Sequence, residues 1–407
     1  MPGKNKIKTI RLTTFTAIAG CLLSGIVCYS CDSRKTVSGK PDVQARAMSG
    51  FPDEEAGIAN GVSACYAGVC KGKLLIAGGC NFPDVPAVEG GQKRFYQGIY
   101  LAEFASDSLF HWEKVGKLPA PAAYGVSITV PDGVVCIGGM NASGSFPTVF
   151  RLSLAADGVL RTDSLPPLPC RMDNMGGCVA GNRLFVAGGN VNGKPSNAAY
   201  SLDLNNLPAG WVALPPFPGN ERVQPVCVGV DSTFYLWGGF SPAFDGKHAS
   251  VSTDGYCFSP ATKEWVSLPS PVDAEGNPVC LGGGVGSALN NDWLFCTGGV
   301  NETVFLSALQ REEALKEALH ANDSVEADSL KAKGREYMLQ PAAYYRFNSH
   351  VWLYDILNKT WTEGGSFPEM ARAGAALAGN GKVFYLINGE LKPGIRTPGI
   401  TKITIQK

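Results

Sequence analysis

The segment INGELKPGIRT, residues 387–397, carries the side chains of this chain best suited to acid–base chemistry. Glu390 directly follows an apolar, strand-like run, while Lys392 and Arg396 lie on either side of the turn Pro393-Gly394. One short loop therefore presents a carboxylate that could accept a proton and two cations that could bind an anion. The alternative interpretation is a charged turn whose side chains neutralise one another.

Other polar residues recur at matching places along the chain. One set precedes an apolar strand-like run and includes Asp173, and the other follows a Gly-Gly pair and includes Asn141 and Asn190. In an antiparallel sheet of four strands, the segment before the first strand and the segment after the second strand lie at the same end of the sheet. Arg at that end would bind a carboxylate, and Asn would bind hydroxyls. We predict a pocket for a polyhydroxylated anion, with substrate contacts from Arg222, Lys392, Asn60, Asn81, Tyr124, Arg171, Asn301 and Arg372. Turn-forming Asn and ion-paired Arg are the structural alternative.

An internal repeat predicts the fold that positions these residues. An apolar run that ends in Gly-Gly occurs five times, and a sixth copy has Asn388 in place of the first Gly. The first positions of these pairs are 78, 138, 188, 238, 298 and 388, so the usual spacing is 50 to 60 residues. A repeat of about 50 residues is typical of kelch motifs.

A second marker precedes most of these pairs. It is a Trp followed by Leu-Pro or Phe-Pro, as in Trp211 with Leu214-Pro215 and Trp265 with Leu268-Pro269. Six units are present, and each reads as four antiparallel strands. The sequence therefore predicts an all-β fold, a six-bladed kelch-type β-propeller over residues 44–407. We expect the strand 401–406 to close the ring by pairing with about residues 44–50.

The longest step between repeats contains an insertion of different composition. Residues from about 303 to 340 are rich in Ala, Leu, Glu and Lys, which predicts helices outside the blade. The insertion is either an amphipathic decoration of the surface or a lid over one mouth of the propeller.

The N-terminus has the pattern of an export signal. Basic residues from Lys4 to Arg11 precede a mostly apolar run that ends at Tyr29. We predict a secretory or lipoprotein signal over 1–31 and a linker over 32–43, with Cys31 favoured over Cys21 as the lipidated residue. An uncleaved transmembrane anchor is the alternative. The expected location is the periplasm of a Gram-negative bacterium, either free or tethered to the outer membrane by the lipid.

The composition excludes several classes of function. The 407 residues include 35 basic and 35 acidic side chains, so the protein has no net positive charge that would attract nucleic acid. We expect contact with a membrane only through the N-terminal lipid. The frequent Gly and low charged content favour a folded, turn-rich β protein. The ten cysteines that follow Cys31 lack a C-x-x-C pair, and most lie in apolar strand-like runs, so we assign no disulfide.

The segment INGELKPGIRT resembles the signature of the sialic acid mutarotase family, also called N-acetylneuraminate epimerase. FPGNERVQPVC (217–227) and AYGVS (123–127) also have counterparts there, although Pro121-Ala122 stands where better-known members have an Arg. Because the signature ends this chain, the order resembles that of a cyclically permuted branch. The resemblance implies a six-bladed kelch propeller that interconverts the anomers of sialic acid or a related sugar acid, with Glu390 as proton acceptor and Arg396 essential.

That reaction requires no metal and no redox cofactor. The four His residues are scattered, which disfavours copper chemistry of the galactose oxidase type, and 252–255 holds only a fragment of a sialidase Asp-box. The main alternative function is a non-catalytic kelch propeller that binds glycan or protein.

Overall fold

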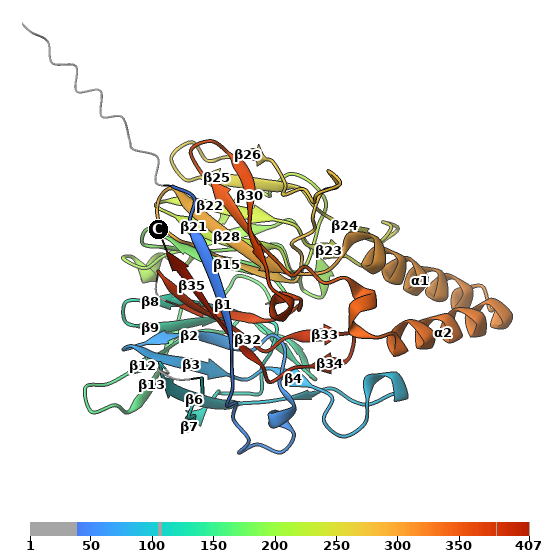
Figure 1. Ribbon diagram of the computed structural model, residues 1–407, viewed down its shortest axis with the longest axis horizontal. Helices are drawn as coiled ribbons and strands as arrows, with labels where there is room; N and C mark the ends of the chain where they lie inside the picture. Colours follow the sequence, from blue (N-terminus) through green and yellow to red (C-terminus); the bar gives the residue numbers. More distant parts are fainter. Residues whose placement is uncertain (1–38, 105–107, 380, 407) are drawn as a thin grey trace, which may run out of the picture. The chain divides into compact units, whose positions relative to one another are not determined.

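The computed structural model describes residues 39–104, 108–379 and 381–406 (Figure 1). The predicted signal over 1–31 and most of the linker lie outside the described residues. Within the described part of the chain, no helix is long and apolar enough to cross a membrane.

The described residues form six antiparallel sheets of four strands each, which confirms the prediction of a mostly β fold. The first three sheets are β2 Tyr66–Cys70, β3 Lys73–Ala77, β6 Gly98–Glu103, β7 Glu113–Lys117; β8 Val126–Val130, β9 Gly133–Ile137, β12 Val149–Leu154, β13 Leu160–Leu165; and β15 Gly176–Ala180, β16 Arg183–Ala187, β19 Ala199–Asp203, β20 Trp211–Leu214. The other three are β21 Val226–Val230, β22 Thr233–Trp237, β25 Gly255–Ser259, β26 Glu264–Leu268; β27 Gly284–Ala288, β28 Trp293–Gly298, β29 His350–Asp355, β30 Thr360–Ser366; and β31 Ala376–Gly379, β32 Val383–Ile387, β35 Ile400–Gln406, β1 Asp42–Met48.

The first strands of the six sheets contact one another in a closed cycle. β2 contacts β8, β8 contacts β15, and the series continues through β21, β27 and β31 back to β2. The main hydrophobic clusters lie between neighbouring sheets: Leu75 and Leu152, for example, share one cluster between the first and second sheets. Each sheet therefore buries both faces against its neighbours, an arrangement consistent with a β-propeller.

A ring of backbone hydrogen bonds joins the residues that enter the first strands. The backbone N–H of each entering residue donates to the carbonyl of the equivalent residue in the neighbouring repeat, at 2.6 to 3.0 Å. The six donors are Ala64, Tyr124, Asn174, Gln224, Gly283 and Gly374. All six have left-handed backbone, with φ between 52° and 75°. The ring closes because the N–H of Ala64 donates to the carbonyl of Gly374.

The Gly-Gly pairs permit close approach between neighbouring sheets. The second Gly of a pair lies at φ from 78° to 111°, and a Cβ added to Gly139 would lie 2.7 Å from Tyr66 Oη and 2.9 Å from Ala123 O. The variant pair keeps the same backbone, because Asn388 has φ 56°. Asn tolerates this conformation better than most residues.

The Trp and Leu-Pro markers connect consecutive repeats. Trp211 Nε1 donates to the carbonyl of Pro166 at 2.9 Å, and Trp265 Nε1 donates to that of Pro215 at 2.8 Å. The last such Trp, Trp361, donates to Pro269. The marker thus repeats because the indole of one sheet satisfies a carbonyl in the preceding repeat.

The two ends of the described chain meet in one sheet. β35 pairs antiparallel with β1, with Met48 opposite Ile400 and Asp42 opposite Gln406. The predicted closure by a C-terminal strand is therefore present.

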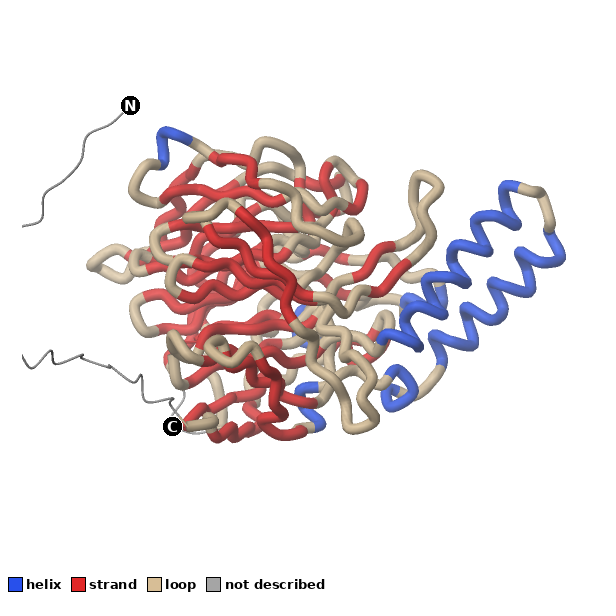
Figure 2. Tube along the Cα trace, turned by 90° about the horizontal axis from the view of Figure 1, so that it is seen from above, coloured by secondary structure: helices blue, strands red, loops and turns tan. Residues whose placement is uncertain are grey.

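Two helices occupy the insertion between β28 and β29. α1 spans Glu302–His320 and begins at Asn301, whose side chain accepts from the N–H of Val304, and α2 spans Ser324–Leu339 (Figure 2). The helices pack on each other through a small cluster that includes Ala318, Ala327 and Leu330. They lie beside the hairpin of β33, Glu390–Lys392, and β34, Ile395–Arg396 (Figure 1).

Two glycine substitutions test which positions the fold constrains. Gly374→Ala adds a Cβ 3.6 Å from Ser63 Cβ, an ordinary contact, so we expect only the cost of left-handed backbone, about 1 kcal/mol of unfolding free energy. Gly139→Ala adds steric overlap, so we expect a loss of about 3 kcal/mol. Urea unfolding of both variants measures the difference. Equal losses would contradict the role given to the Gly-Gly pair.

Candidate active site

The β33–β34 hairpin brings Glu390 and Arg396 together. The two residues are opposite each other in the hairpin, which turns at Pro393-Gly394, where Gly394 has φ 81°. Arg396 Nη2 lies 2.5 Å from Glu390 Oε1. The hairpin follows the sixth pair directly, and the bridge between Ala373 and Glu390 ties it to the segment that enters β31.

The Arg396 guanidinium is in contact with three neighbouring side chains, and one of its nitrogens has no hydrogen-bond partner among the described residues. Its Nε donates to Ser63 Oγ at 3.1 Å, and its guanidinium lies 5.0 Å from the ring centre of Phe82. The residue is only 8% exposed, yet its Nη1 has no hydrogen-bond partner among the described residues. A buried guanidinium N–H without an acceptor favours a ligand that supplies an anionic oxygen.

Glu390 and Arg396 line a cavity of about 620 Å³. Its walls come from the hairpin, the loop after β4 Cys80–Asn81, Tyr124, and the facing sides of α1 and α2. The charged side chains that line it are Lys93, Arg311, Lys331, Arg335, Arg396, Glu312 and Glu390. Five cations against two carboxylates leave an excess of three positive charges, which favours an anionic ligand.

Tyr124 and Lys93 form a second polar pair in this cavity. Lys93 Nζ donates to Tyr124 Oη at 2.8 Å and lies 4.8 Å from the centre of the Tyr124 ring. Burial, with the neighbouring Cys80 and Glu390, raises the pKa of Tyr124 well above 10.0, although Arg396 opposes the shift. The phenol therefore keeps its proton at neutral pH.

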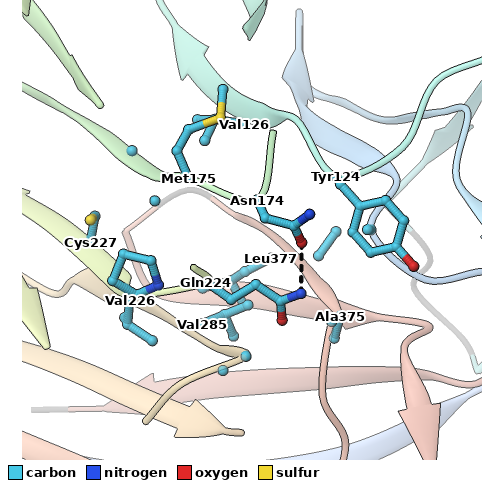
Figure 3. A pocket seen from close by; sticks show the side chains of 18 of the residues that line it. Tyr124, Val126, Asn174, Met175, Gln224, Val226, Cys227, Val285, Ala375 and Leu377 are labelled. Atoms are coloured by element: carbon cyan, nitrogen blue, oxygen red, sulfur yellow. Dashed lines mark hydrogen bonds between the residues drawn. The ribbon is translucent and has the colours of Figure 1, made fainter. Parts of the chain in front are cut away.

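Tyr124 also lines a cavity of about 200 Å³ at the ring of entering residues (Figure 3). Gln224 Nε2 donates to Asn174 Oδ1 at 2.7 Å, and Asn174 Nδ2 donates to Asp173 Oδ1 at 2.6 Å. Asp173 is 2% exposed and also accepts from Asn190. This network fixes the amides of Asn174 and Gln224 on one side of the ring, next to Tyr124.

Of the predicted site residues, Glu390, Arg396 and Tyr124 line the larger cavity together. Lys392 instead donates to the carbonyls of Met338 and Gln340, at 3.3 and 2.7 Å, and so ties the hairpin to the end of α2. Asn301 is the N-cap of α1.

Three more predicted contacts bind the protein's own backbone or are exposed. Asn81 is 2% exposed, and its Nδ2 donates to the carbonyls of Gly57 and Gly61. Arg171 is exposed and donates to Ser145 O at 3.3 Å. Asn60 is exposed at the end of the short helix Ile58–Asn60. These three residues do not line the larger cavity.

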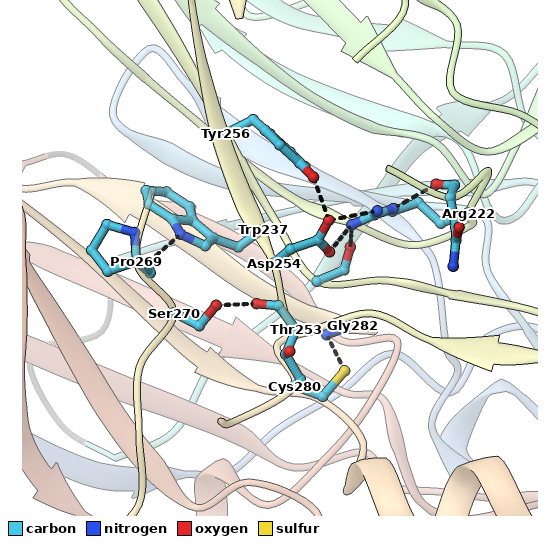
Figure 4. Close-up of polar contacts among 11 residues, drawn as sticks. Arg222, Trp237, Thr253, Asp254, Tyr256, Pro269, Ser270, Cys280 and Gly282 are labelled. Carbon is cyan, nitrogen blue, oxygen red and sulfur yellow. Dashed lines mark hydrogen bonds and ion pairs between the residues drawn. The ribbon is translucent and has the colours of Figure 1, made fainter. Parts of the chain in front are cut away.

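Arg222 and Arg372 lie in the interior of the fold. Arg222 is 1% exposed and makes two hydrogen bonds to Asp254, of 2.6 and 3.0 Å (Figure 4). Arg372 donates to the carbonyls of Asn388 and Gly399, and burial lowers the pKa of Arg372 to about 10. Neither residue lines the larger cavity, so contact with a ligand stays a prediction from sequence.

Sequence reasoning missed Lys93, Phe82, Asn174 and Gln224. Lys93 and Phe82 lie in the long loop after β4, where no repeat register marks them. Asn174 and Gln224 stand directly at the matching ring position of their repeats, so aligning the six copies there could have found them.

The fold and the cavity together define a propeller-like protein with a carboxylate–guanidinium pair in a cationic pocket. A sequence model of the N-acetylneuraminate epimerase family matches residues 8–160 and 165–407, so the chain belongs to that family.

Individual relatives carry the same name. The chain is 30% identical over 240 residues to the N-acetylneuraminate epimerase of Salmonella paratyphi B, covering 58% of this chain and 56% of the relative. It is 31% identical over 232 residues to that of Haemophilus influenzae, covering 57% of each. The chain thus spans just over half the length of these relatives. Among solved structures, one titled "Structure of YjhT" has a TM-score of 0.50 and 29% identity, covering 60% of this chain and 67% of that one.

The pair of Arg222 and Asp254 predicts a stability effect. We expect Asp254→Asn to lower the unfolding free energy by about 2 kcal/mol at pH 7, because Arg222 stays buried without its counter-charge. Burial disfavours the Asp254 carboxylate, but the hydrogen bonds and charge of Arg222 outweigh burial and hold the pKa of Asp254 below 3.8.

The stabilisation by the Arg222–Asp254 pair depends on pH in a defined direction. Because the pKa is lowered in the folded state, the stabilisation is present above pH 3.8 and is lost as the pH falls through the folded value. Urea unfolding between pH 7 and pH 3 should show this loss in the wild type and not in Asp254→Asn. Parallel pH profiles would contradict it.

Proposed function

We propose that this protein is a sialic acid mutarotase, an enzyme that interconverts the anomers of N-acetylneuraminate or a related sugar acid. The observation that supports this most is the buried Arg396, whose Nη1 lacks a partner among the described residues while Nη2 binds Glu390. A sugar acid supplies both features that this site lacks, an anionic oxygen for the guanidinium and a hydroxyl for the carboxylate. The family membership and the excess positive charge of the cavity point to the same class of substrate.

In the proposed reaction Glu390 is the general base and Arg396 binds the substrate carboxylate. Glu390 takes the proton of the anomeric hydroxyl, the ring carbon–oxygen bond breaks, and the open-chain ketone rotates before the ring closes on its other face. The contact with Arg396 Nη2 holds the Glu390 carboxylate in the cavity where the substrate would bind. Arg396 also compensates negative charge that develops on the substrate.

The architecture that we propose for this enzyme is a six-bladed kelch propeller with a permuted order of repeats. The six sheets, the closed ring of backbone hydrogen bonds and the pairing of β1 with β35 support it. A permutation leaves the geometry of a closed ring unchanged. The alignments with individual relatives cover only part of each chain, as a changed order would produce.

We also propose that the protein is exported and anchored by a lipid at Cys31, from the basic and apolar pattern of residues 1–31. Its substrate would then be free sugar acid outside the cytoplasm.

Glu390→Gln tests the proposed reaction. Because the amide cannot take a proton, we expect kcat for anomer exchange to fall by about a hundredfold to ten-thousandfold while the sugar still binds. Proton NMR on freshly released α-sialic acid measures the exchange, and calorimetry measures binding. Glu264→Gln, on the exposed face of β26, is the matched control. Wild-type protein that binds the sugar without accelerating exchange would indicate the non-catalytic alternative.

A further inference from the structure

Opening a sugar ring requires a proton on the ring oxygen as well as a base for the anomeric hydroxyl. Glu390 cannot supply that proton in the same step, since it is the group that accepts one. We infer that Tyr124 is the catalytic acid of this site and that Lys93 is the positioning residue that acts through it. The inference rests on the proposed function.

Tyr124 lies between the two cavities of the site. Tyr124 lines the same cavity as Glu390 and Arg396 and also lines the smaller cavity at the ring of entering residues. Figure 3 shows its hydroxyl directed away from the Asn174–Gln224 pair. A sugar bound to Arg396 therefore has a carboxylate base and a phenol available in one cavity.

The hydrogen bond from Lys93 prepares the phenol for proton transfer. The ammonium donates to a lone pair of Tyr124 Oη at 2.8 Å. A phenol oxygen that accepts from a cation still has its own hydrogen to donate, and the phenolate left after transfer is stabilised by the same bond. Lys93 is held over the rings of Tyr124 and Phe82, at 4.8 and 5.8 Å from their centres.

The backbone at Tyr124 is a further sign of function. Its φ of 61° lies in the left-handed region that all six ring positions adopt, two of which are Gly. A bulky aromatic residue is disfavoured in this conformation, and such positions cluster at active sites. The ring of hydrogen bonds requires left-handed backbone at this position, but it does not require the residue to be a tyrosine.

The proton balance of the step is complete. Glu390 takes the hydroxyl proton, the carbonyl forms, and the electron pair of the broken bond goes to the ring oxygen, which takes the Tyr124 proton. On closure the former ring oxygen attacks the other face of the carbonyl and returns its proton to the phenolate, while Glu390 protonates the carbonyl oxygen. A departing alkoxide is a stronger base than a phenolate, so proton transfer from the phenol to the ring oxygen is favourable.

Two other possible proton donors line the cavity, Glu312 on α1 and Tyr337 on α2. Among the described residues, no hydrogen bond ties either side chain to the Glu390–Arg396 pair, so both are less well placed. Lys392 uses its ammonium on two carbonyls at the end of α2. Glu312→Gln therefore serves as the competing variant.

Tyr124→Phe keeps the ring and removes the proton. We expect kcat for anomer exchange to fall by about a hundredfold, with KM within about threefold of the wild type. Tyr200→Phe, which removes a hydroxyl contacted by the Cys170 thiol outside the cavity, is the matched control. Thermal unfolding checks that each variant is folded.

Chemical rescue tests Lys93 with a readout that a structural role would not move. We expect Lys93→Ala to lose about tenfold or more in kcat and to regain activity as ethylamine is added. Glu390→Gln should not respond to ethylamine. A Lys93→Ala variant that keeps wild-type kcat, or whose loss ethylamine does not relieve, overturns the role of Lys93.

The outcomes separate this inference from the proposed function. If wild-type protein exchanges anomers and Glu390→Gln is slow, but Tyr124→Phe keeps the wild-type kcat or only Glu312→Gln is slow, Tyr124 is not the acid and the proposed function stands. If wild-type protein accelerates no exchange, the proposed function itself fails and the inference fails with it.

Discussion

The ring of six backbone hydrogen bonds is the constraint on which the rest of the structure depends. Each entering residue donates to its neighbour in left-handed conformation, so the ring joins the starts of the first strands of all six sheets. The ring brings the Gly-Gly pairs against the next sheet and explains why a Cβ is excluded at Gly139. The cycle is completed by the two ends of the described chain, because β1 supplies the fourth strand of the sheet that β31 begins.

Much of this architecture could be predicted from the sequence, because repetition magnifies weak local signals. One apolar run before Gly-Gly indicates little, but six copies at similar spacing indicate a cyclic assembly. Even the replacement of Gly by Asn388 follows the same rule, since both residues accept positive φ. The indole bonds of Trp211 and Trp265 were not predictable, because spacing along the chain does not say which repeat a side chain reaches.

The site was less accessible to sequence reasoning, and the arginines show why. Arg396 lies opposite Glu390 in a short hairpin, where local geometry alone forces the pair to meet. Arg222 occupies an equally suggestive place before a strand, yet its side chain turns into the interior toward Asp254, 32 residues later. The repeat register determines the backbone position from which a side chain extends, whereas packing determines which partner the side chain reaches. Lys93 escaped notice for the converse reason, because the loop after β4 is longer than the matching loop between β33 and β34, and no repeat register marks its residues.

The cavity is built from two parts of different origin. Glu390, Arg396 and Tyr124 stand on the ring of repeats, whose geometry six sheets determine together. Arg311, Lys331 and Arg335 stand on the inserted helices. Polar contacts tie these helices to the rest of the site, such as Arg335 to the carbonyl of Val88 and Lys392 to those of Met338 and Gln340. Groups that exchange protons need fixed distances, whereas cations that attract a ligand act over a range of distances. The division of the site between a rigid ring and an added wall therefore matches what each part of the proposed chemistry requires.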